Sequence, residues 1–367
     1  MNREGDARYM RRAVELAGRG LGLTSPNPVV GAVAVRGGEI VGEGFHQRAG
    51  EAHAEVSALA AAGPRAEGAT LYVTLEPCVH HGKTPPCVDG ILQAGVGRVV
   101  VAVQDPNPLV NGRGLERLRD AGVDVTVGVE QEAATRLNRP FFKYITTGRP
   151  FVTLKVAMTL DGKIADREGS SRWITGEAAR GLVHRMRSQA DAILVGIGTV
   201  LKDDPGLTVR LERPWPREPF RVVVDSRLRT PPDARLIRAG RPDRVIVACV
   251  DLAPPERAKR LDAQGIQLLS LPGSDGRVDL AGLMAALGAR QIVSVLAEGG
   301  SEIGAALLEQ GLVDRVAWFV APCLLGGQAA PGPVGGAGRR LKEALHLRNV
   351  TWTPVGDDLL VEGDVDV

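Results

Sequence analysis

The stretch that decides the fold and the chemistry of this chain begins with His53-Ala54-Glu55 and continues with PCVHHGKTPPC at 77–87. His53 is expected at the start of a helix, Cys78 after a strand, and Cys87 at the start of the next helix. One imidazole and two thiolates give Zn²⁺ three protein ligands and leave a fourth tetrahedral position for water. Helix N-termini help to keep the two thiols deprotonated. The sequence therefore predicts a zinc site on His53, Cys78 and Cys87.

Glu55 is the expected proton carrier of this site. It lies two residues after His53, so on a regular helix the two side chains would point to nearly opposite sides. They converge if the metal lies beyond the N-terminal end of the helix, where Glu55 could move a proton from a bound water to a leaving group. His-x-Glu with Pro-Cys-x-x-Cys is the signature of zinc deaminases of nucleobases, but eight residues separate the cysteines here. This departure leaves an alternative open, in which His80 or His81 closes a four-coordinate structural site.

Alternating strand and helix signals on both sides of this stretch predict an α/β fold with largely parallel sheets. The pattern loosens over 130–149, which places a domain boundary near Gly148 and gives domains 1–148 and 149–367. The Gly- and Pro-rich stretch 326–338 is expected to be a surface loop. The expected helices are 7–17, 53–62, 87–94, 115–121, 177–188, 280–287 and 301–310. The expected strands are 29–35, 40–44, 70–75, 98–103, 123–129, 151–157, 192–196, 221–225, 244–248, 292–297 and 314–320.

Composition and net charge exclude several classes of protein. The 367 residues include 45 basic and 43 acidic ones, a formal net charge of +2 that gives no reason to expect nucleic-acid or membrane binding. A hydrophobic share of 44% excludes wholesale disorder, and the sequence has no transmembrane or signal-peptide apolar run. A soluble, cytoplasmic protein is expected. Four cysteines are too few for a disulfide framework, and Cys249 and Cys323 are expected to be buried small hydrophobes.

Further motifs in the first half strengthen the zinc hypothesis. They are TSPNPVVG at 24–31, GEGFH at 42–46, EPC at 76–78, DPNP at 105–108 and NGRG at 111–114. Together with the metal motif they resemble the bifunctional riboflavin-biosynthesis deaminase/reductase family, in which the longer cysteine spacing is normal. The resemblance implies a cytidine-deaminase-like α/β/α domain with zinc on the three ligands above and Glu55 as proton shuttle.

The same resemblance implies polar contacts to the pyrimidine and the ribose phosphate. The chemistry fits, because an amide can pair with the ring edge and a lysine can meet a phosphate as a point charge. Asn27 could instead be a turn residue, and Asp105 with its Pro-Asn-Pro could be a loop cap. The residues implied are Asn27, His46, Lys83, Asp105 and Asn107.

The second half is less explicit on its own, because no Gly-x-Gly-x-x-Gly follows its first strand. GIGT at 196–199 and EGGS at 298–301 each follow an expected strand, where small residues let backbone N–H groups approach a phosphate. Either could also be an ordinary tight turn. The family resemblance continues through KVAMTLDGKIA at 155–165, SRWIT at 171–175, DDPGLTVR at 203–210, Asp225-Ser226, EGG at 298–300 and Ala321-Pro322.

This part of the resemblance implies a dihydrofolate-reductase-like α/β domain that uses NADPH. Lys155 and Glu298, at strand ends, are candidates for orienting the ribose during reduction. Arg187 could instead lie on a solvated helix face, and Trp173 could be a core residue. The implied cofactor residues are Ala157, Trp173, Thr199, Asp203, Ser226 and Gly300. The implied substrate residues are Ser171, Arg187, Leu207, Arg210 and Glu298.

The resulting interpretation is a homo-oligomeric enzyme of two steps. The first domain would deaminate 2,5-diamino-6-(5-phosphoribosylamino)pyrimidin-4(3H)-one, and the second would reduce the ribosyl group of 5-amino-6-(5-phosphoribosylamino)uracil with NADPH. Two competing classes are a deaminase of a nucleic-acid base, which would need a basic surface, and a non-catalytic zinc-stabilised binding protein, which would have no use for Glu55.

Overall fold

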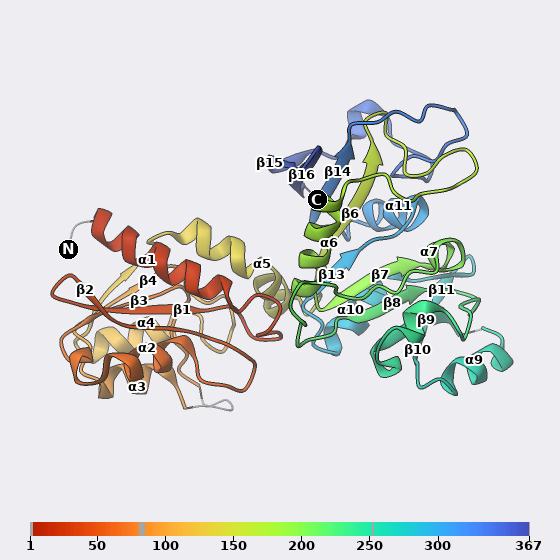
Figure 1. Ribbon diagram of the computed structural model, residues 1–367. Coiled ribbons are helices and arrows are strands. Elements are labelled where there is room, and N and C mark those ends of the chain that lie inside the picture. Colours follow the sequence, from red (N-terminus) through yellow and green to blue (C-terminus); the bar gives the residue numbers. More distant parts are fainter. Residues whose placement is uncertain (1–2, 81–84, 252, 367) are drawn as a thin grey trace. The chain divides into compact units, whose positions relative to one another are not determined.

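The computed structural model describes residues 3–80, 85–251 and 253–366 (Figure 1). The chain forms two compact units, Met1–Arg149 and Pro150–Val367. Both units consist of helices packed on a β-sheet, which is the predicted fold class. Within the described ranges, no helix combines the length and the apolar character needed to cross a membrane.

The N-terminal unit contains one mixed sheet. Its strands are β1 Gly31–Arg36, β2 Glu39–Phe45, β3 Thr70–Val73, β4 Arg98–Val101 and β5 Asp124–Val127. Their order in the sheet is β2-β1-β3-β4-β5. β3, β4 and β5 are parallel, as expected, whereas β1 is antiparallel to both β2 and β3. The carboxyl ends of β3 and β4 therefore lie side by side at one edge of the sheet.

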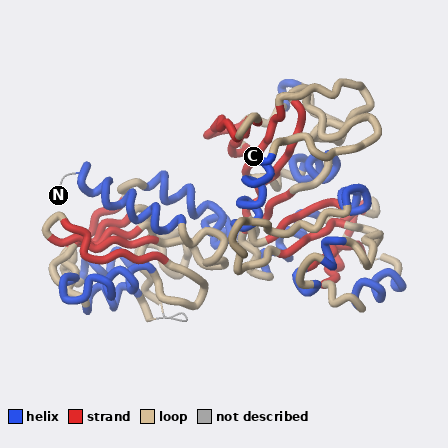
Figure 2. Tube along the Cα trace, viewed as in Figure 1, coloured by secondary structure: helices blue, strands red, loops and turns tan. Residues whose placement is uncertain are grey.

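Helices cover both faces of this sheet (Figure 2). Along β1 the side chains alternate: Ala32 and Ala34 pack against α2, α3 and α4, and Val33 and Val35 pack against α1 and α5. This α/β/α sandwich is the architecture that the sequence predicts. The helices are α1 Arg3–Gly18, α2 Ala54–Ala62, α3 Cys87–Gln93, α4 Arg113–Asp120 and α5 Gln131–Thr147.

Glycines in β2 bring α2 directly onto the sheet. A Cβ atom on Gly42 would lie 2.2 Å from the carbonyl oxygen of Ala58, and one on Gly44 would lie 2.5 Å from that of Ala54. Because no side chain fits there, the backbones of helix and strand approach closely. This contact fixes the N-terminal end of α2, where the predicted metal ligand His53 lies.

Helix α5 was not predicted, because the sequence pattern loosens over 130–149. The 17-residue helix buries only Ala134, Asn138 and Phe141, and it contains Pro140. A proline inside a helix removes one hydrogen bond, and a narrow apolar stripe gives a weak periodic signal. The helix is held by tertiary packing against the sheet rather than by a pattern that can be recognised locally.

The C-terminal unit contains a larger sheet. Its main strands are β6 Phe151–Thr159, β7 Ala192–Gly196, β8 Phe220–Val224, β9 Val245–Val250, β10 Gln267–Leu271, β13 Ser294–Ala297, β14 Arg315–Ala321, β15 Leu347–Val355 and β16 Asp358–Val365. Their order is β10-β9-β8-β7-β13-β6-β14-β16-β15. The first seven are parallel, and β16 and β15 are antiparallel to their neighbours. β11 Gly273–Ser274 and β12 Arg277–Val278 form a separate small hairpin.

Helices again pack on both faces of the sheet. α10 Leu280–Ala289 and α11 Ser301–Glu309 share one core with Leu154 and Leu194, and the shorter helices share another core with Ile193 and Val223. α6 packs on the far part of the sheet through Ala179 against Phe319. The remaining helices are α6 Glu177–Gln189, α7 Ile197–Asp203, α8 Arg235–Arg238 and α9 Pro255–Asp262.

This unit differs from the sequence expectations in its last forty residues and at Cys323. No strand is expected beyond residue 320, yet the C-terminal residues form the edge hairpin β15–β16. Cys249 is buried as expected, but the prediction for Cys323 is wrong, because this residue is exposed. Its apolar neighbours Leu324 and Leu325 are exposed too, so the local apolar run does not mark a core strand.

Candidate active sites

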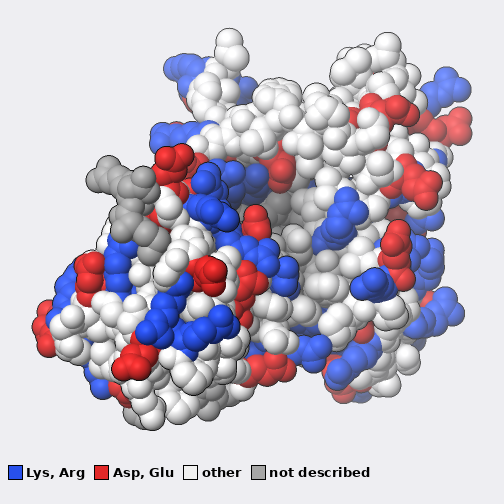
Figure 3. Space-filling view, turned by 60° about the vertical axis from the view of Figure 1, so that its left-hand side comes forward, with Lys and Arg blue, Asp and Glu red and all other residues white. Residues whose placement is uncertain are grey.

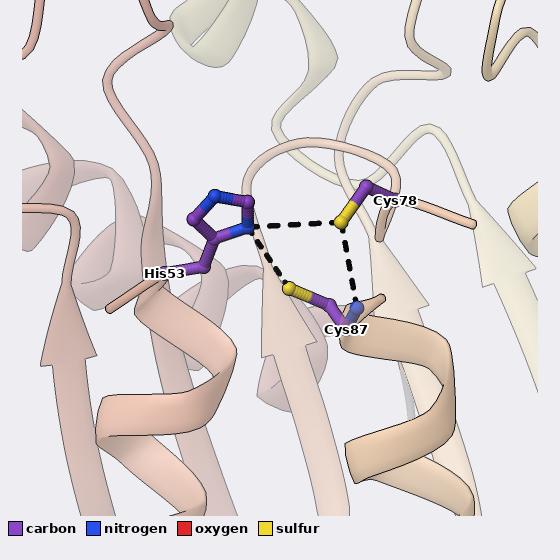
Figure 4. Close-up of side chains that lie close together, drawn as sticks. All are labelled: His53, Cys78 and Cys87. Atoms are coloured by element: carbon purple, nitrogen blue, oxygen red, sulfur yellow. Dashed lines mark hydrogen bonds between the residues drawn. The ribbon is translucent and has the colours of Figure 1, made fainter. Parts of the chain in front are cut away.

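The predicted zinc ligands meet at one point of the N-terminal unit. His53 is the residue before the first turn of α2, Cys78 follows β3, and Cys87 is the first residue of α3. Their three ligand atoms lie within 4.8 Å of one another, and the side chains point toward a common centre (Figure 4). Among the described residues, this is the one cluster of three or more such groups that could hold a metal ion.

The distances in this cluster match the chemistry of zinc. The Nδ1 atom of His53 lies 3.1 Å from Sγ of Cys87 and 3.7 Å from Sγ of Cys78. Bond lengths of about 2.0–2.1 Å for nitrogen and 2.3 Å for sulfur place two such ligands of one tetrahedral ion about 3.5 Å apart. The three side chains therefore fit Zn²⁺ with little rearrangement, and they leave a fourth direction open for water.

The electrostatics of the two thiols favour metal binding. The hydrogen bond with the Cys87 side chain, then those with His53 and the Cys87 backbone N–H, lower the pKa of Cys78 to about 4. The N–H of Cys87 donates to Sγ of Cys78 at 3.4 Å. The same thiol–thiolate hydrogen bond and burial raise the pKa of Cys87. A bound cation would favour the thiolate form of both residues, because metal ligation requires deprotonated sulfur.

Glu55 lies in the first turn of α2, directly beside the cluster. Its side chain is 3% exposed, and burial raises its pKa to about 7, with the carboxyl in hydrogen-bond contact with Cys87. His53 has extended backbone angles, φ −72° and ψ 162°, rather than helical ones. His53 and Glu55 therefore do not point to opposite sides, as they would on a regular helix. Both side chains face the cluster of ligand atoms.

The alternative of a closed four-ligand site finds no support in the described residues. His80 is exposed and does not belong to the cluster. His81 lies outside the described residues, as does the predicted phosphate contact Lys83. A three-ligand site is the arrangement that a catalytic zinc requires.

Asn27 and His46 form a polar pair near these ligands. Nδ2 of Asn27 lies 3.1 Å from Nε2 of His46, and Nδ1 of His46 lies 3.1 Å from the carbonyl oxygen of Ala52. A carbonyl can only accept, so Nδ1 donates the hydrogen bond to Ala52; burial lowers the pKa of His46. Nε2 then accepts from the Asn27 amide, whose oxygen remains as an acceptor for a ring N–H. The backbone of Asn27 also forms a turn with Thr24, so it is a turn residue as well.

A buried side chain that the sequence analysis missed holds the Asn27 loop. Asn138 on α5 accepts from the N–H of Val29 at 2.9 Å and donates to its carbonyl oxygen at 2.8 Å. The two residues are 109 positions apart, so no local pattern connects them. Only the recognition of α5 as a helix facing the sheet could have suggested the contact.

Asp105 and Asn107 organise the loop after β4. Oδ1 of Asp105 accepts the N–H of Asn107 at 2.8 Å, and Oδ1 of Asn107 accepts the N–H of Leu109 at 3.1 Å. These bonds are those of a loop cap, the alternative left open for this motif. Asp105 is nevertheless buried, and this burial raises its pKa to about 6. Buried carboxyl groups with such shifts often mark binding sites.

In the C-terminal unit, parallel register brings Lys155 and Glu298 together. β13 pairs with β6 so that Ala297 lies opposite Leu154, which makes Lys155 and Glu298 neighbours one step further along. Both side chains are largely buried. Burial lowers the pKa of Lys155; burial also raises that of Glu298, but the nearby Arg187 and Lys155 lower it overall.

Arg187 on α6 completes this cluster. Its Nε and NH2 groups donate to the two carboxylate oxygens of Glu298 at 2.6 and 2.8 Å, and NH1 donates to the carbonyl oxygen of Thr208 at 3.2 Å. The Arg187 side chain is only 13% exposed. The alternative of a solvated helix face is therefore wrong, and the bidentate partner of Arg187 is a carboxylate of the protein.

The other predicted reductase residues fall into three groups. Ser171 donates to Oδ1 of Asp203 at 3.2 Å, so a predicted substrate residue and a predicted cofactor residue are in contact. Gly300 precedes α11, and a Cβ on it would lie 3.9 Å from Oγ1 of Thr199. Ala157 packs beside Phe319 within the sheet.

Four positions have distinct surroundings. Trp173 is 68% exposed and stacks with Arg180 at 4.7 Å, so it is not a core residue. Leu207 is buried in the core, which leaves only its backbone for a substrate. The N–H of Arg210 donates to Nδ1 of His184, and its side chain is exposed. Oγ of Ser226 accepts from the N–H of Val278.

The residues at these strand ends fit NADPH. β7 and β13 are parallel neighbours; β7 ends at Gly196 directly before α7, and the segment from Glu298 to Gly300 joins β13 to α11. Ligands of α/β sheets bind beyond the carboxyl ends of parallel strands, where glycines permit close approach of phosphate. A Cβ on Gly300 would meet only Oγ1 of Thr199, at an ordinary contact distance, so the backbone here can come close to a dinucleotide.

The geometry defines a class of protein: a zinc-dependent deaminase unit joined to an α/β reductase unit. Family models agree, since residues 3–103 match the cytidine and deoxycytidylate deaminase zinc-binding region and residues 150–361 match the RibD C-terminal domain. The chain belongs to the RibD family of riboflavin biosynthesis proteins. This confirms the resemblance seen in the motifs.

Individual relatives cover almost the whole chain. The riboflavin biosynthesis protein RibD of Actinobacillus pleuropneumoniae is 46% identical over 97% of this chain and 94% of its own length. That of Escherichia coli K12 is 47% identical over 88% of this chain and 89% of its own. The structure of Acinetobacter baumannii RibD, form 1, matches with a TM-score of 0.90 at 39% identity, covering 100% of both chains. A Thermotoga maritima diaminohydroxyphosphoribosylaminopyrimidine deaminase/5-amino-6-(5-phosphoribosylamino)uracil reductase matches with a TM-score of 0.86 at 39% identity over 99% of both.

Proposed function

We propose that residues 1–148 deaminate 2,5-diamino-6-(5-phosphoribosylamino)pyrimidin-4(3H)-one and that residues 149–367 reduce 5-amino-6-(5-phosphoribosylamino)uracil with NADPH. The observation that carries the first step is the three-ligand cluster of His53, Cys78 and Cys87 with the buried Glu55 beside it. The second step follows from the buried charges at the strand ends of the other unit. The two reactions named for the Thermotoga relative are the same pair.

In the deamination step, Glu55 is the group that moves the proton. When bound, Zn²⁺ supplies a Lewis acid that lowers the pKa of water toward neutrality. Glu55 accepts a proton from the attacking water and delivers it to the departing amine, so that the ring gains oxygen and ammonia leaves. A pKa raised to about 7 by burial suits a group that must both take and give a proton near neutral pH.

Other side chains of this unit orient the pyrimidine. The amide oxygen of Asn27 can accept from an N–H of the ring edge, because its Nδ2 is oriented by Nε2 of His46. Asp105 and Asn107 can bind the hydroxyl groups of the ribose, and Lys83 can meet the phosphate as a point charge. The Asn27 contact holds the reacting carbon near the metal, and the ribose and phosphate contacts contribute to substrate affinity.

In the reduction step, the chain orients the ribose and excludes water. When bound, NADPH supplies the hydride, and that chemistry belongs to the cofactor. Lys155 and Glu298 are the groups that orient the opened sugar, and Arg187 holds Glu298 through two hydrogen bonds. Ser171, Leu207 and Arg210 complete the substrate side. The cofactor contacts are Ala157, Trp173, Thr199, Asp203, Ser226 and Gly300.

The finer setting of the enzyme is also part of this proposal. A cytoplasmic homo-oligomer that binds neither nucleic acid nor membranes fits the near-neutral net charge and the exposed edge strand β15, whose Trp352 is 66% exposed. On the face drawn in Figure 3, basic and acidic side chains are interspersed. A deaminase of a nucleic-acid base would need a continuous basic surface.

One set of measurements tests the proposal. The purified chain should hold one zinc per molecule and release ammonia from the diaminopyrimidine, and NADPH should be oxidised only when the deaminated product is present. Single-stranded RNA and DNA offered as substrates should release no ammonia. Ammonia release from a nucleic acid but not from the pyrimidine would support the nucleic-acid alternative. Zinc without any deamination would support a binding protein.

A further inference from the structure

Glu76 is a buried carboxylate placed between strand β3 and the zinc ligand Cys78. Its side chain is 4% exposed, yet within the described residues it lies in no ion pair with a lysine or arginine. Instead it accepts four backbone N–H groups. Oε2 accepts from Asp105 at 3.1 Å and from Gly112 at 2.9 Å, and Oε1 accepts from Gly114 at 2.8 Å and from Leu115 at 3.4 Å.

These four donors come from both ends of one loop. Asp105 follows β4, and the other three lie at the start of α4, where Gly112 adopts a left-handed backbone with φ 89°. The first N–H groups of a helix have no partners inside the helix, and a carboxylate satisfies them while interacting favourably with the helix dipole. A single side chain therefore closes the segment 105–115 into a fixed loop.

Gly114 shows how tightly the two segments are joined. A Cβ at this position would lie 2.2 Å from the carbonyl oxygen of Pro77 and 3.1 Å from Oε1 of Glu76. The start of α4 thus packs directly on the backbone that leads to Cys78. The metal-binding segment and the 105–115 loop are held in one fixed register.

We propose that Glu76 is a positioning residue for deamination, which sets Asp105 and Asn107 relative to the metal ligands. This inference rests on the proposed function, in which Asp105 and Asn107 bind the ribose part of the substrate. The path is short: Glu76 fixes the Asp105 backbone, Asp105 Oδ1 accepts from Asn107, and Asn107 Oδ1 accepts from Leu109. Each link joins a side chain to a backbone N–H.

The substitution Glu76→Gln tests this role with little change of shape. A glutamine has one oxygen and one NH₂ group, so two of the four N–H donors would face another donor. The loop should loosen, and the KM for the diaminopyrimidine should rise at least tenfold, while kcat falls less than threefold because the ribose contacts are remote from the reacting carbon. Zinc content and NADPH-dependent reduction should be unchanged. Glu116→Gln, the same change at an exposed position of α4, should leave KM unaltered.

A double-mutant cycle separates positioning from a purely structural role. Asp105→Ala should raise KM on its own, and adding Glu76→Gln to it should raise KM less than twofold further, because the second change acts through the first. If Asp105→Ala leaves KM unchanged, the proposed substrate site is wrong and the inference fails with it. If Asp105→Ala raises KM but Glu76→Gln does not, or the two effects multiply in full, only the inference about Glu76 is overturned.

Glu76→Asp provides a second variant should the glutamine protein not fold. It keeps the charge but withdraws the carboxylate by one methylene, so it should hold fewer of the four N–H groups and raise KM by a smaller factor at full zinc occupancy. A loss of zinc, with normal KM in the zinc-loaded fraction, would assign Glu76 to the metal-binding segment alone and overturn the proposal.

Discussion

The two units assemble their chemistry over different distances along the chain. In the N-terminal unit the metal ligands and Glu55 all lie between residues 53 and 87, each at a strand end or a helix start. In the C-terminal unit the bidentate ion pair joins Arg187 and Glu298, which are 111 positions apart. The first site is made by local elements that share one edge of a sheet. The second site depends on the strand order of the sheet, in which β13 lies between β6 and β7. We therefore expect that the zinc site of the N-terminal unit can be lost without loss of the ion-pair site of the C-terminal unit. Variants of each unit test this independence.

The largest effect is expected from removing a metal ligand. Cys78→Ser should lose zinc and all measurable ammonia release, because a serine hydroxyl at neutral pH is a poor zinc ligand. NADPH oxidation with the deaminated pyrimidine should continue, since the C-terminal unit has its own core. Zinc analysis and both assays on one preparation check this. Cys323→Ser, at the exposed cysteine, is the control and should keep zinc and both activities.

Loss of both reactions in a Cys78→Ser protein that remains folded, as judged by circular dichroism, would contradict the independence of the two units. The zinc ion would then have a structural role in both units.

The next effect is expected from the proton carrier. Glu55→Gln should keep zinc, because the ligands are untouched, and should lower kcat for deamination by about 10²–10⁴-fold or more, the range for loss of general acid–base catalysis. The amide keeps the shape of the side chain but cannot exchange the proton. Glu51→Gln, at an exposed position just before α2, serves as the matched control. Near-normal deamination in zinc-loaded Glu55→Gln would remove Glu55 from its role.

The N-terminal site could be predicted because its residues carry short-range signals. Histidine and cysteine residues at helix starts are rare, so they indicate a metal site without a structure. The strand and helix boundaries around them can also be predicted from local sequence signals. The residues that hold the site could not be predicted. Asn138 reaches Val29 across 109 positions, and Glu76 reaches Gly114 across 38. An asparagine or a glutamate has the same local pattern whether it faces water or a buried backbone amide.

In the C-terminal unit, the buried ion pair of Arg187 and Glu298 is the feature that differs most from the metal site of the N-terminal unit. Arg187→Met should leave Glu298 charged, buried and without its bidentate partner, which costs about 3–5 kcal/mol of unfolding free energy. The double variant Arg187→Met/Glu298→Gln should recover part of this loss. Denaturant unfolding measures both. Arg185→Met, on the same helix but exposed, should change stability by less than about 0.5 kcal/mol. Ammonia release by the N-terminal unit should persist in all three, and equal stability of Arg187→Met and Arg185→Met would refute the argument.

The sequence could not distinguish a solvated Arg187 from a buried one, because its position on α6 is compatible with both. The difference arises from topology: the parallel register of β6 and β13 places Lys155 and Glu298 side by side and gives the guanidinium a carboxylate to bind. The edge hairpin β15–β16 escaped prediction for a related reason, since β15 is exposed along almost its whole length and has no buried apolar face.

The smallest effect is expected at the predicted cofactor turn, and the structure makes this test cleaner than the sequence alone could. Gly300 has φ −73° and ψ −177°, extended backbone that any residue can adopt, and its nearest neighbour for a Cβ is Oγ1 of Thr199 at 3.9 Å. The position therefore has room for a Cβ without backbone strain. Its neighbour Gly299 is unsuitable, because a Cβ there would lie 1.8 Å from Cγ2 of Ile303 and would disturb packing itself.

Gly300→Val should consequently fold normally and fail to accommodate the dinucleotide. The branched side chain would fill the space beyond β13 that phosphate oxygens need, and NADPH affinity should fall at least tenfold, about 1.4 kcal/mol. Gly300→Ala adds a single methyl group and should lose less, so the two variants form a graded series. Titration of NADPH by fluorescence measures the affinity, thermal unfolding confirms the fold, and ammonia release should not change in either variant. Unaltered NADPH binding by a folded Gly300→Val protein would place the cofactor away from the ends of β7 and β13, and the C-terminal site would then have to be sought at other strands of the same sheet.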